Sequence, residues 1–289
     1  MRHRPRSVYR AMFAAALTVA LAAVVLQLRT DALRAEVITP VPRPAPALAR
    51  AAAPVAPEPS AATPTAPLPP LHVVGLGDSV MAGTACNCRT ILSRFAQSLA
   101  QREGRTVTDV NLGVAGYTTQ DVLSQLTDDP GTRQDVQKAD IVIMIIGAND
   151  LKDDFDAWLH GGCNSACYQP DVTAMQDRLV SIIRQTQALR AGQPTTILVD
   201  NYWNVFADGD VARAQGGQRQ LDWSVAVTTA VNSAIAQASA QSGARTVDLV
   251  HVFKGSGDED PTSLLADDGD HPNAAGVQAI VAANLAALG

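Results

Sequence analysis

Short apolar runs alternate with longer amphipathic stretches from Leu71 to the end of the chain. The apolar runs are rich in Val and Ile, as buried parallel strands are, and they cover Leu71–Leu76, Val107–Leu112, Ile141–Ile146, Thr196–Val199 and Arg245–Val250. The amphipathic stretches predict helices at Ile91–Arg102, Thr119–Leu126, Val172–Leu189, Trp223–Ser242 and Ala274–Ala287. Strict alternation of this kind predicts an α/β fold, a three-layer α/β/α sandwich around a five-stranded parallel sheet.

Residues suited to catalysis follow the predicted strands directly. Ligands bind beyond the carboxyl ends of the strands in such sheets. A serine, several glycines, an asparagine and acids gather there, in Gly77-Asp78-Ser79, Gly113 to Gly116, Gly147 to Asp150, Asp200 to Trp203 and the loop after His251. We therefore expect a catalytic site at this edge of the sheet.

Ser79 is the candidate nucleophile. It follows the first strand in Gly75-Leu-Gly-Asp-Ser-Val, where the small side chain lets the chain turn sharply into a helix and expose the hydroxyl. A serine hydroxyl is a poor nucleophile alone and needs an adjacent base. A helix N-cap is the competing interpretation. The G-x-S-x-G elbow of α/β-hydrolases is missing, so that fold is not indicated.

His271 is the candidate general base, in Asp267-Asp-Gly-Asp-His-Pro-Asn. Asp268 is best placed to accept from one ring nitrogen and to fix the tautomer that leaves the other free; Asp267 and Asp270 are alternatives. The other histidines of the domain are His72 at a strand start, His160 in a Gly/Cys-containing loop, and His251, a weak rival at the end of the last strand. The competing interpretation is a solvated acidic turn with a cap at Asn273.

Two residues are candidates for stabilising an oxyanion. Gly116 offers an unobstructed backbone amide, and Asn149 offers a side-chain amide. Pre-positioned donors of this kind contribute about 3–4 kcal/mol each. Judged alone, the two residues are as easily a turn glycine and a loop asparagine.

Taken together, these blocks resemble the SGNH hydrolases, also called GDSL esterases and lipases. The matching residues are Gly77-Asp-Ser-Val80, Gly116, Gly147-Ala-Asn-Asp150 and Asp268-Gly-Asp-His271, spread over residues 71–289. The resemblance implies a flavodoxin-like fold, Ser79 as nucleophile, His271 as base and Asp268 as its orienting acid. It also implies an oxyanion hole from Ser79, Gly116 and Asn149. Val80 replaces the Leu of the name-giving motif, and the cysteine-bearing loop 153–170 is not part of the core pattern.

This resemblance implies a serine esterase that forms an acyl-enzyme on Ser79, with acyl groups on carbohydrate, lipid or cell-wall polymer as substrates. An O-acyltransferase of envelope polysaccharide and a non-catalytic binding module on a stalk are the alternatives. Tyr117, Tyr202 and Trp203 follow strands and could line the substrate pocket, or they pack as ordinary partly buried aromatics. The chemistry calls for no metal and no organic cofactor.

The first 70 residues differ from the rest. Residues 1–37 combine an arginine-rich start with an uncharged apolar run from Ala11 to Leu28, which predicts a cytoplasmic basic tail and a membrane anchor, or a cleaved signal segment. Residues 38–70 hold 11 prolines and 10 alanines, which predicts a semi-rigid or disordered linker. The catalytic domain at 71–289 is therefore expected outside the cytoplasm, anchored to the membrane or secreted.

Charge and cysteine content limit the partners further. Residues 71–289 carry 14 basic and 25 acidic residues, a formal charge of −11, which argues against nucleic-acid binding. Export favours disulfides, within or between the loops that bear the four cysteines, Cys86, Cys88, Cys163 and Cys167. A zinc site is the competing idea, although the spacing fits no zinc motif well. We expect a monomer whose partners are an ester substrate and, through an uncleaved N-terminal segment, the membrane.

Overall fold

The computed structural model describes residues 68–289. The predicted tail and membrane segment, and the linker up to residue 67, lie outside the described residues. None of the helices between residues 68 and 289 is both long enough and apolar enough to cross a membrane.

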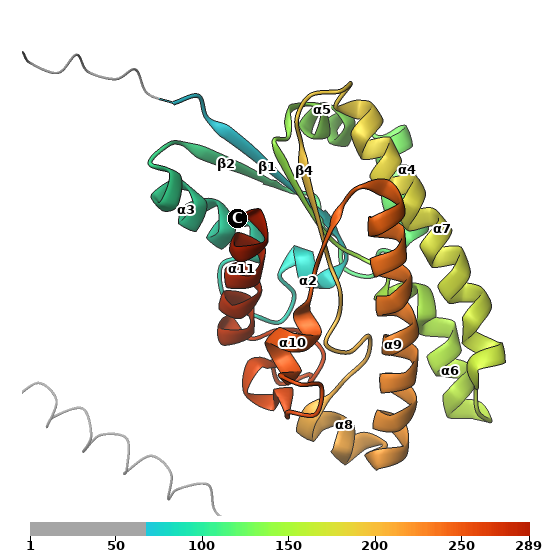
Figure 1. Ribbon diagram of the computed structural model, residues 1–289. Helices are drawn as coiled ribbons and strands as arrows, with labels where there is room; N and C mark the ends of the chain where they lie inside the picture. Colours follow the sequence, from blue (N-terminus) through green and yellow to red (C-terminus); the bar gives the residue numbers. More distant parts are fainter. Residues whose placement is uncertain (1–67) are drawn as a thin grey trace, which may run out of the picture. The chain divides into compact units, whose positions relative to one another are not determined.

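A five-stranded parallel sheet forms the centre of the domain (Figure 1). Its strands are β1 (Leu71–Gly77), β2 (Val107–Asn111), β3 (Ile141–Ile145), β4 (Thr196–Asp200) and β5 (Arg245–Val247), in the spatial order β2-β1-β3-β4-β5. Every residue of β3 is buried, as expected of a central strand covered on both faces. The predicted α/β sandwich with five parallel strands is confirmed.

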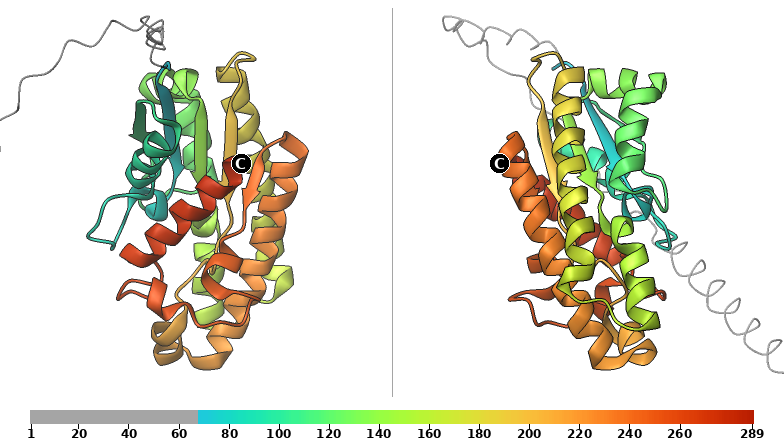
Figure 2. Two further views of the ribbon diagram at one scale, coloured as in Figure 1. Left: turned by 60° about the vertical axis from the view of Figure 1, so that its left-hand side comes forward. Right: turned by 90° about the vertical axis from the view of Figure 1, so that its right-hand side faces the viewer.

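Helices cover both faces of the sheet (Figure 2). One face carries α3 (Ile91–Glu103) and α11 (Ala274–Leu288), which pack against each other. The other face carries a packed group of four helices, α4 (Thr119–Asp128), α5 (Pro130–Lys138), α7 (Ser165–Leu189) and α9 (Gly217–Ser242). The remaining helices are α2 (Ser79–Ala82), α6 (Lys152–His160), α8 (Gly209–Gln215) and α10 (Leu249–Lys254), with the 3-10 turns η2 (Ala148–Leu151) and η3 (Pro261–Leu264).

The last strand is shorter than its apolar run predicts. It ends at Val247 because Asp248 caps α10 by accepting from the His251 amide (3.3 Å). Asn201 Oδ1 also accepts from the Leu249 amide at 2.6 Å. The expected strand Arg245–Val250 is therefore wrong in its second half, and His251 lies on a helix.

The cysteine-bearing segment 153–170 is mostly helical rather than a loop. It contains all of α6 except its first residue, Lys152, and the first turns of α7, which include Pro170. Cys163 and Cys167 form one disulfide, and Cys86 and Cys88 form the other. Each bridge closes its own short segment, so the two cysteine-bearing segments are not joined to each other.

Candidate active site

Ser79 lies on a sharp corner between β1 and α2. At Gly77 the backbone of β3 approaches so closely that a Cβ atom would stand 2.1 Å from the Ile145 carbonyl oxygen, and its φ is +155°. Asp78 then caps α2 by accepting from the Val80 amide at 2.9 Å. Ser79 is thus the first helical residue, and its hydroxyl stands at the carboxyl edge of the sheet.

A small cavity of about 40 Å³ opens beside Ser79. It brings together three of the predicted catalytic residues, Ser79, Asn149 and His271. The other lining residues come from the corner, from η2, from the segment after β4 and from the loop before His271: Asp78, Val80, Ala148, Tyr202, Trp203, Asn204, Val205 and Asp270. Tyr202 and Trp203, expected to contact substrate, therefore line this cavity, although both are almost fully buried.

His271 is held by Asp268. Its Nδ1 donates to Asp268 Oδ2 over 2.7 Å, and its backbone amide donates to Asp268 Oδ1 over 3.0 Å. Partial burial raises the pKa of Asp268, but the bonds from the Asp270 and His271 amides and from the imidazole outweigh it and lower this pKa. Asp268 therefore stays ionised and fixes the tautomer whose Nε2 is free to take a proton. In the described part of the chain, neither Asp267 nor Asp270 forms a hydrogen bond with the imidazole.

Asn149 and Gly116 come from neighbouring loops. Asn149 Nδ2 donates to the carbonyl oxygen of Tyr117 at 2.9 Å, which fixes the side-chain amide next to Gly116. Gly116 has φ +85° and lies at the exposed rim, outside the set of residues that line the cavity. Within residues 68–289, the amides of Ser79 and Gly116 have no hydrogen-bond acceptor, so both are available to a ligand.

The loop that carries Asn149 is fixed by an ion pair between the buried Asp150 carboxylate and the partly exposed Arg178. Asp150 accepts from Arg178 Nη2 at 2.8 Å and from the Thr119 amide at 2.9 Å. The Thr119 hydroxyl donates to the same carboxylate, and Arg178 Nε reaches that hydroxyl oxygen at 2.8 Å. Asp150 therefore connects η2 to α4 and α7 and limits movement of Asn149.

A buried hydrogen bond between Tyr202 and Asp78 was not foreseen from the sequence. The Tyr202 hydroxyl donates to Asp78 Oδ2 at 2.5 Å, and the nearby Ala148 amide lowers the pKa of Tyr202. The phenol oxygen thus binds the residue next to Ser79 and lies close to the residue next to Asn149. Burial raises the pKa of Asp78 to about 6, against the lowering effect of Tyr202. Burial and the nearby Asp78 charge raise the pKa of Tyr202 well above its usual value.

The loop before His271 is tied to the segment after β4. The Asp208 amide donates to the Gly269 carbonyl at 2.7 Å. The Asp208 carboxylate accepts from Lys254 Nζ at 2.6 Å and from Asn204 Nδ2 at 3.1 Å. All of these side chains are buried. This ion pair therefore helps to place the loop that carries the candidate base.

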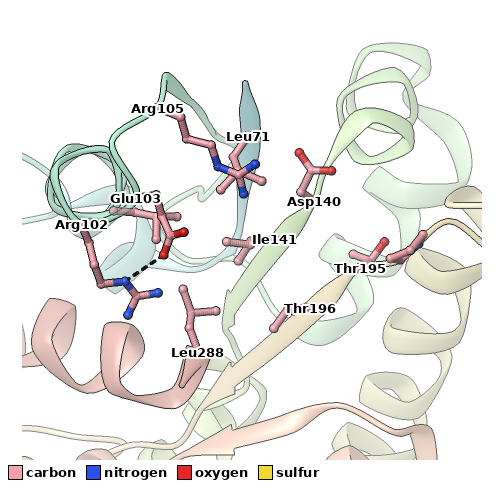
Figure 3. A pocket seen from close by; sticks show the side chains of 11 residues that line it. Leu71, Arg102, Glu103, Arg105, Asp140, Ile141, Thr195, Thr196 and Leu288 are labelled. Atoms are coloured by element: carbon pink, nitrogen blue, oxygen red, sulfur yellow. Dashed lines mark hydrogen bonds and ion pairs between the residues drawn. The ribbon is translucent and has the colours of Figure 1, made fainter. Parts of the chain in front are cut away.

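A larger cleft, of about 590 Å³, lies at the other end of the sheet (Figure 3). Leu71, Ile141 and Thr196, which line it, are the first residues of their strands. The Arg102–Glu103 ion pair borders this cleft (Figure 3), and none of its lining residues is a serine or a histidine. Three other histidines, His72, His160 and His251, do not line the cavity at Ser79 either.

Comparison with known families agrees with this geometry. Residues 76–279 match the model of the GDSL-like Lipase/Acylhydrolase family. The chain belongs to this family. Its members, the SGNH hydrolases, are serine carboxylic-ester hydrolases, and this one is an esterase or lipase-type enzyme of the same class. No curated protein sequence matches the chain.

Solved structures of similar fold share little sequence with this SGNH hydrolase. A lipase from a goat rumen metagenome has 17% identity and a TM-score of 0.61, with 75% of this chain and 97% of that chain covered. An α/β hydrolase from the metagenome of Lake Arreo, Spain, has 21% identity and a TM-score of 0.52 (75% and 94% covered). A variant acetyl xylan esterase from Geobacillus stearothermophilus has 18% identity and a TM-score of 0.54 (76% and 94% covered). These likenesses establish the fold.

Proposed function

We propose that this SGNH hydrolase cleaves esters of short carboxylic acids through an acyl-enzyme on Ser79, outside the cytoplasm. The observation that carries the proposal is the placement of Ser79, Asn149 and His271 around one small cavity, with His271 oriented by Asp268.

The reaction follows from these contacts. The Ser79 hydroxyl oxygen attacks the ester carbonyl carbon while His271 Nε2 takes its proton. The oxyanion is stabilised by the amides of Ser79 and Gly116 and by Asn149 Nδ2. Collapse of the intermediate breaks the bond to the alcohol, which leaves with the proton from His271. Water then attacks the acyl-enzyme in the same way, which releases the carboxylic acid and restores Ser79.

The size of the cavity favours a short acyl group. A cavity of about 40 Å³ is far smaller than the pockets of roughly 300–1,000 Å³ that hold drug-sized ligands. Its inner wall consists of buried side chains such as Tyr202, Trp203 and Val205, whereas His271 is partly exposed at the mouth. We infer that the acyl group enters the cavity and that the alcohol, which His271 must protonate, remains on the open side.

Two features of the chain support a location outside the cytoplasm. The arginine-rich start followed by an apolar run is typical of exported or anchored proteins. The two disulfides of the described domain are typical of oxidising compartments. Protease added to spheroplasts, whose cytoplasmic membrane is intact, is expected to degrade an anchored domain, and a secreted domain is expected in the culture medium. A domain that stays protected until the cytoplasmic membrane is lysed would contradict this location.

The catalytic proposal is tested with the variant Ser79→Ala and a series of 4-nitrophenyl esters. We expect the wild type to hydrolyse the acetate faster than the butyrate and the octanoate, and the variant to lose activity on all of them. Ser181→Ala is the matched control, because Ser181 is exposed on α7, and its activity should equal that of the wild type. Hydrolysis by Ser79→Ala at the wild-type rate would refute the proposal.

A further inference from the structure

Several polar side chains around the catalytic cavity are held by hydrogen bonds within the domain. Asp78 and Tyr202 bind each other, and Asp78 also caps α2. Asn204 is also fully engaged, because it donates to Asp208 and Ser224 and accepts from Thr228 and the Phe206 amide. These side chains are therefore held by hydrogen bonds within the domain.

Asp270 differs from all of them. Its half-buried side chain lines the cavity together with Ser79 and His271, yet its carboxylate accepts no hydrogen bond from any residue between 68 and 289. The proposed reaction does not use this group either, since Asp268 already orients His271. The charge of Asp270 nevertheless reaches into the site, where it helps to raise the pKa of Asp78.

The backbone holds Asp270 in place without help from its side chain. The Asp270 amide donates to Asp268 Oδ1 at 3.0 Å. The preceding residue, Gly269, is tied to the Asp208 amide and has φ +70°. At Gly269 a Cβ atom would stand 2.5 Å from Val211 Cβ, so the turn is closely packed. The position of Asp270 beside the nucleophile is therefore pre-organised.

A partly buried carboxylate without a partner is unfavourable for stability, because it loses water and gains no donor in return. Burial accordingly raises the pKa of Asp270, although the nearby His271 lowers it. A ligand that brought a hydrogen-bond donor would offset this loss. Hydrogen bonds to charged groups are stronger than those between neutral groups.

We infer that Asp270 is a specificity-determining residue that accepts a hydrogen bond from a hydroxyl or ammonium group of the substrate, close to the ester. This inference rests on the proposed esterase function and narrows its substrates. The preferred class is esters of polyols, hydroxy acids or amino acids, whereas plain alkyl esters and simple lipids lack the donor. An acyl group that fits the cavity leaves room for one such donor on its α-carbon, and the alcohol can offer another at the mouth.

Pairs of esters of equal size test the inference. On the acyl side, methyl propionate is compared with methyl glycolate and methyl glycinate, in which a hydroxyl or an ammonium replaces the terminal methyl group. On the alcohol side, propyl acetate is compared with 2-hydroxyethyl acetate. The measured quantity is the ratio of kcat/KM for the donor-bearing ester to that for its plain partner, in the wild type, Asp270→Ala and Asp270→Asn. The intrinsic reactivities of the two esters contribute equally to this ratio in every variant, so they cancel when the ratio is compared between the wild type and the variants.

We expect the ratio to fall about tenfold in Asp270→Ala, on the acyl side, the alcohol side or both; this is the factor that corresponds to about 1.4 kcal/mol. If the ratio for the glycinate falls in both Asp270→Ala and Asp270→Asn, the group bound by Asp270 is an ammonium. If the ratio for the hydroxyl esters falls in Asp270→Ala but stays near the wild-type value in Asp270→Asn, that group is a hydroxyl. Asp267→Asn is the control, because Asp267 is exposed in the same loop outside the cavity, and its ratios should match the wild type.

Ratios that are the same in the wild type and in both Asp270 variants would overturn the inference. If Asp270→Ala does not fold, Asp270→Leu, which has nearly the same shape and cannot accept a hydrogen bond, decides in its place. The outcome is separate from that of the proposed function. If Ser79→Ala remains active, the esterase mechanism fails; if Ser79 is essential but the ratios do not move, only the role of Asp270 fails.

Discussion

Asp200 makes the stability of this enzyme depend on pH in a way that one substitution should remove. Its carboxyl group is fully buried at the end of β4 and accepts from Asn284 Nδ2 at 2.8 Å, while Asp200 Oδ1 has no partner in the described domain. Burial raises its pKa from 3.8 to about 8, despite the lowering effect of Asn284. The folded protein therefore holds a proton on Asp200 at pH values where the unfolded chain has lost it.

The size of the effect follows from this shift. Because the folded-state pKa is the higher one, Asp200 stabilises the fold most below the unfolded-state pKa. This stability is lost as the pH rises toward the folded-state value. Between about pH 5 and about pH 7 the folded state binds one extra proton, so the free energy of unfolding falls by about 1.4 kcal/mol per pH unit, or about 2.7 kcal/mol in total. Asp200→Asn keeps the shape and does not titrate.

Urea denaturation across this pH range measures the difference directly. We expect the free energy of unfolding of Asp200→Asn, relative to the wild type, to rise by about 2–3 kcal/mol from about pH 5 to about pH 7. Asp177→Asn, which changes an exposed aspartate on α7, should give a difference that does not vary with pH. A constant difference for Asp200→Asn as well would refute the reasoning, because it would mean that Asp200 is not protonated in the folded protein.

Three further substitutions test the site and its support. Asp268→Asn should lower kcat by up to about ten thousandfold, because His271 loses the group that fixes its tautomer; a kcat within tenfold of the wild type would contradict that role. Lys254→Met leaves the Asp208 carboxylate buried without its partner and should cost about 3–5 kcal/mol in urea denaturation, whereas an unchanged midpoint would show that the pair does not hold the loop. Val205→Ala enlarges the cavity and should raise kcat/KM for a butyrate relative to an acetate, so an unchanged ratio would show that Val205 does not limit acyl length.

The sequence predicts the fold well because the three central strands, β1, β3 and β4, are largely buried and read as continuous apolar runs. It fails where a side chain distant in the chain decides the outcome. The run after Arg245 looks like a longer strand, but Asp248 and Asn201 turn it into a helix at Leu249. Asn201 is 48 residues away from Leu249, so no local pattern indicates this bond.

The candidate site shows the same difference between contacts made by neighbours in the sequence and contacts made by residues far apart in the chain. Asp268 and His271 are three residues apart, and their hydrogen bond could be inferred from the motif alone. The bond between Asp78 and Tyr202 spans 124 residues, and Tyr202 looked from the sequence like a residue that contacts substrate. Local motifs therefore predict the pairing of the candidate base and its acid, while the bond between Asp78 and Tyr202 depends on the tertiary structure.

The phenol oxygen of Tyr202 also bears on how this enzyme can change over evolution. Because it binds the neighbour of Ser79 and lies close to the neighbour of Asn149, a substitution there would disturb the nucleophile and the oxyanion donor at once. Val205 and Asp270 line the same cavity, and neither side chain forms a hydrogen bond within residues 68–289. New substrate preferences should therefore arise first at these two positions, while Tyr202 tolerates little variation.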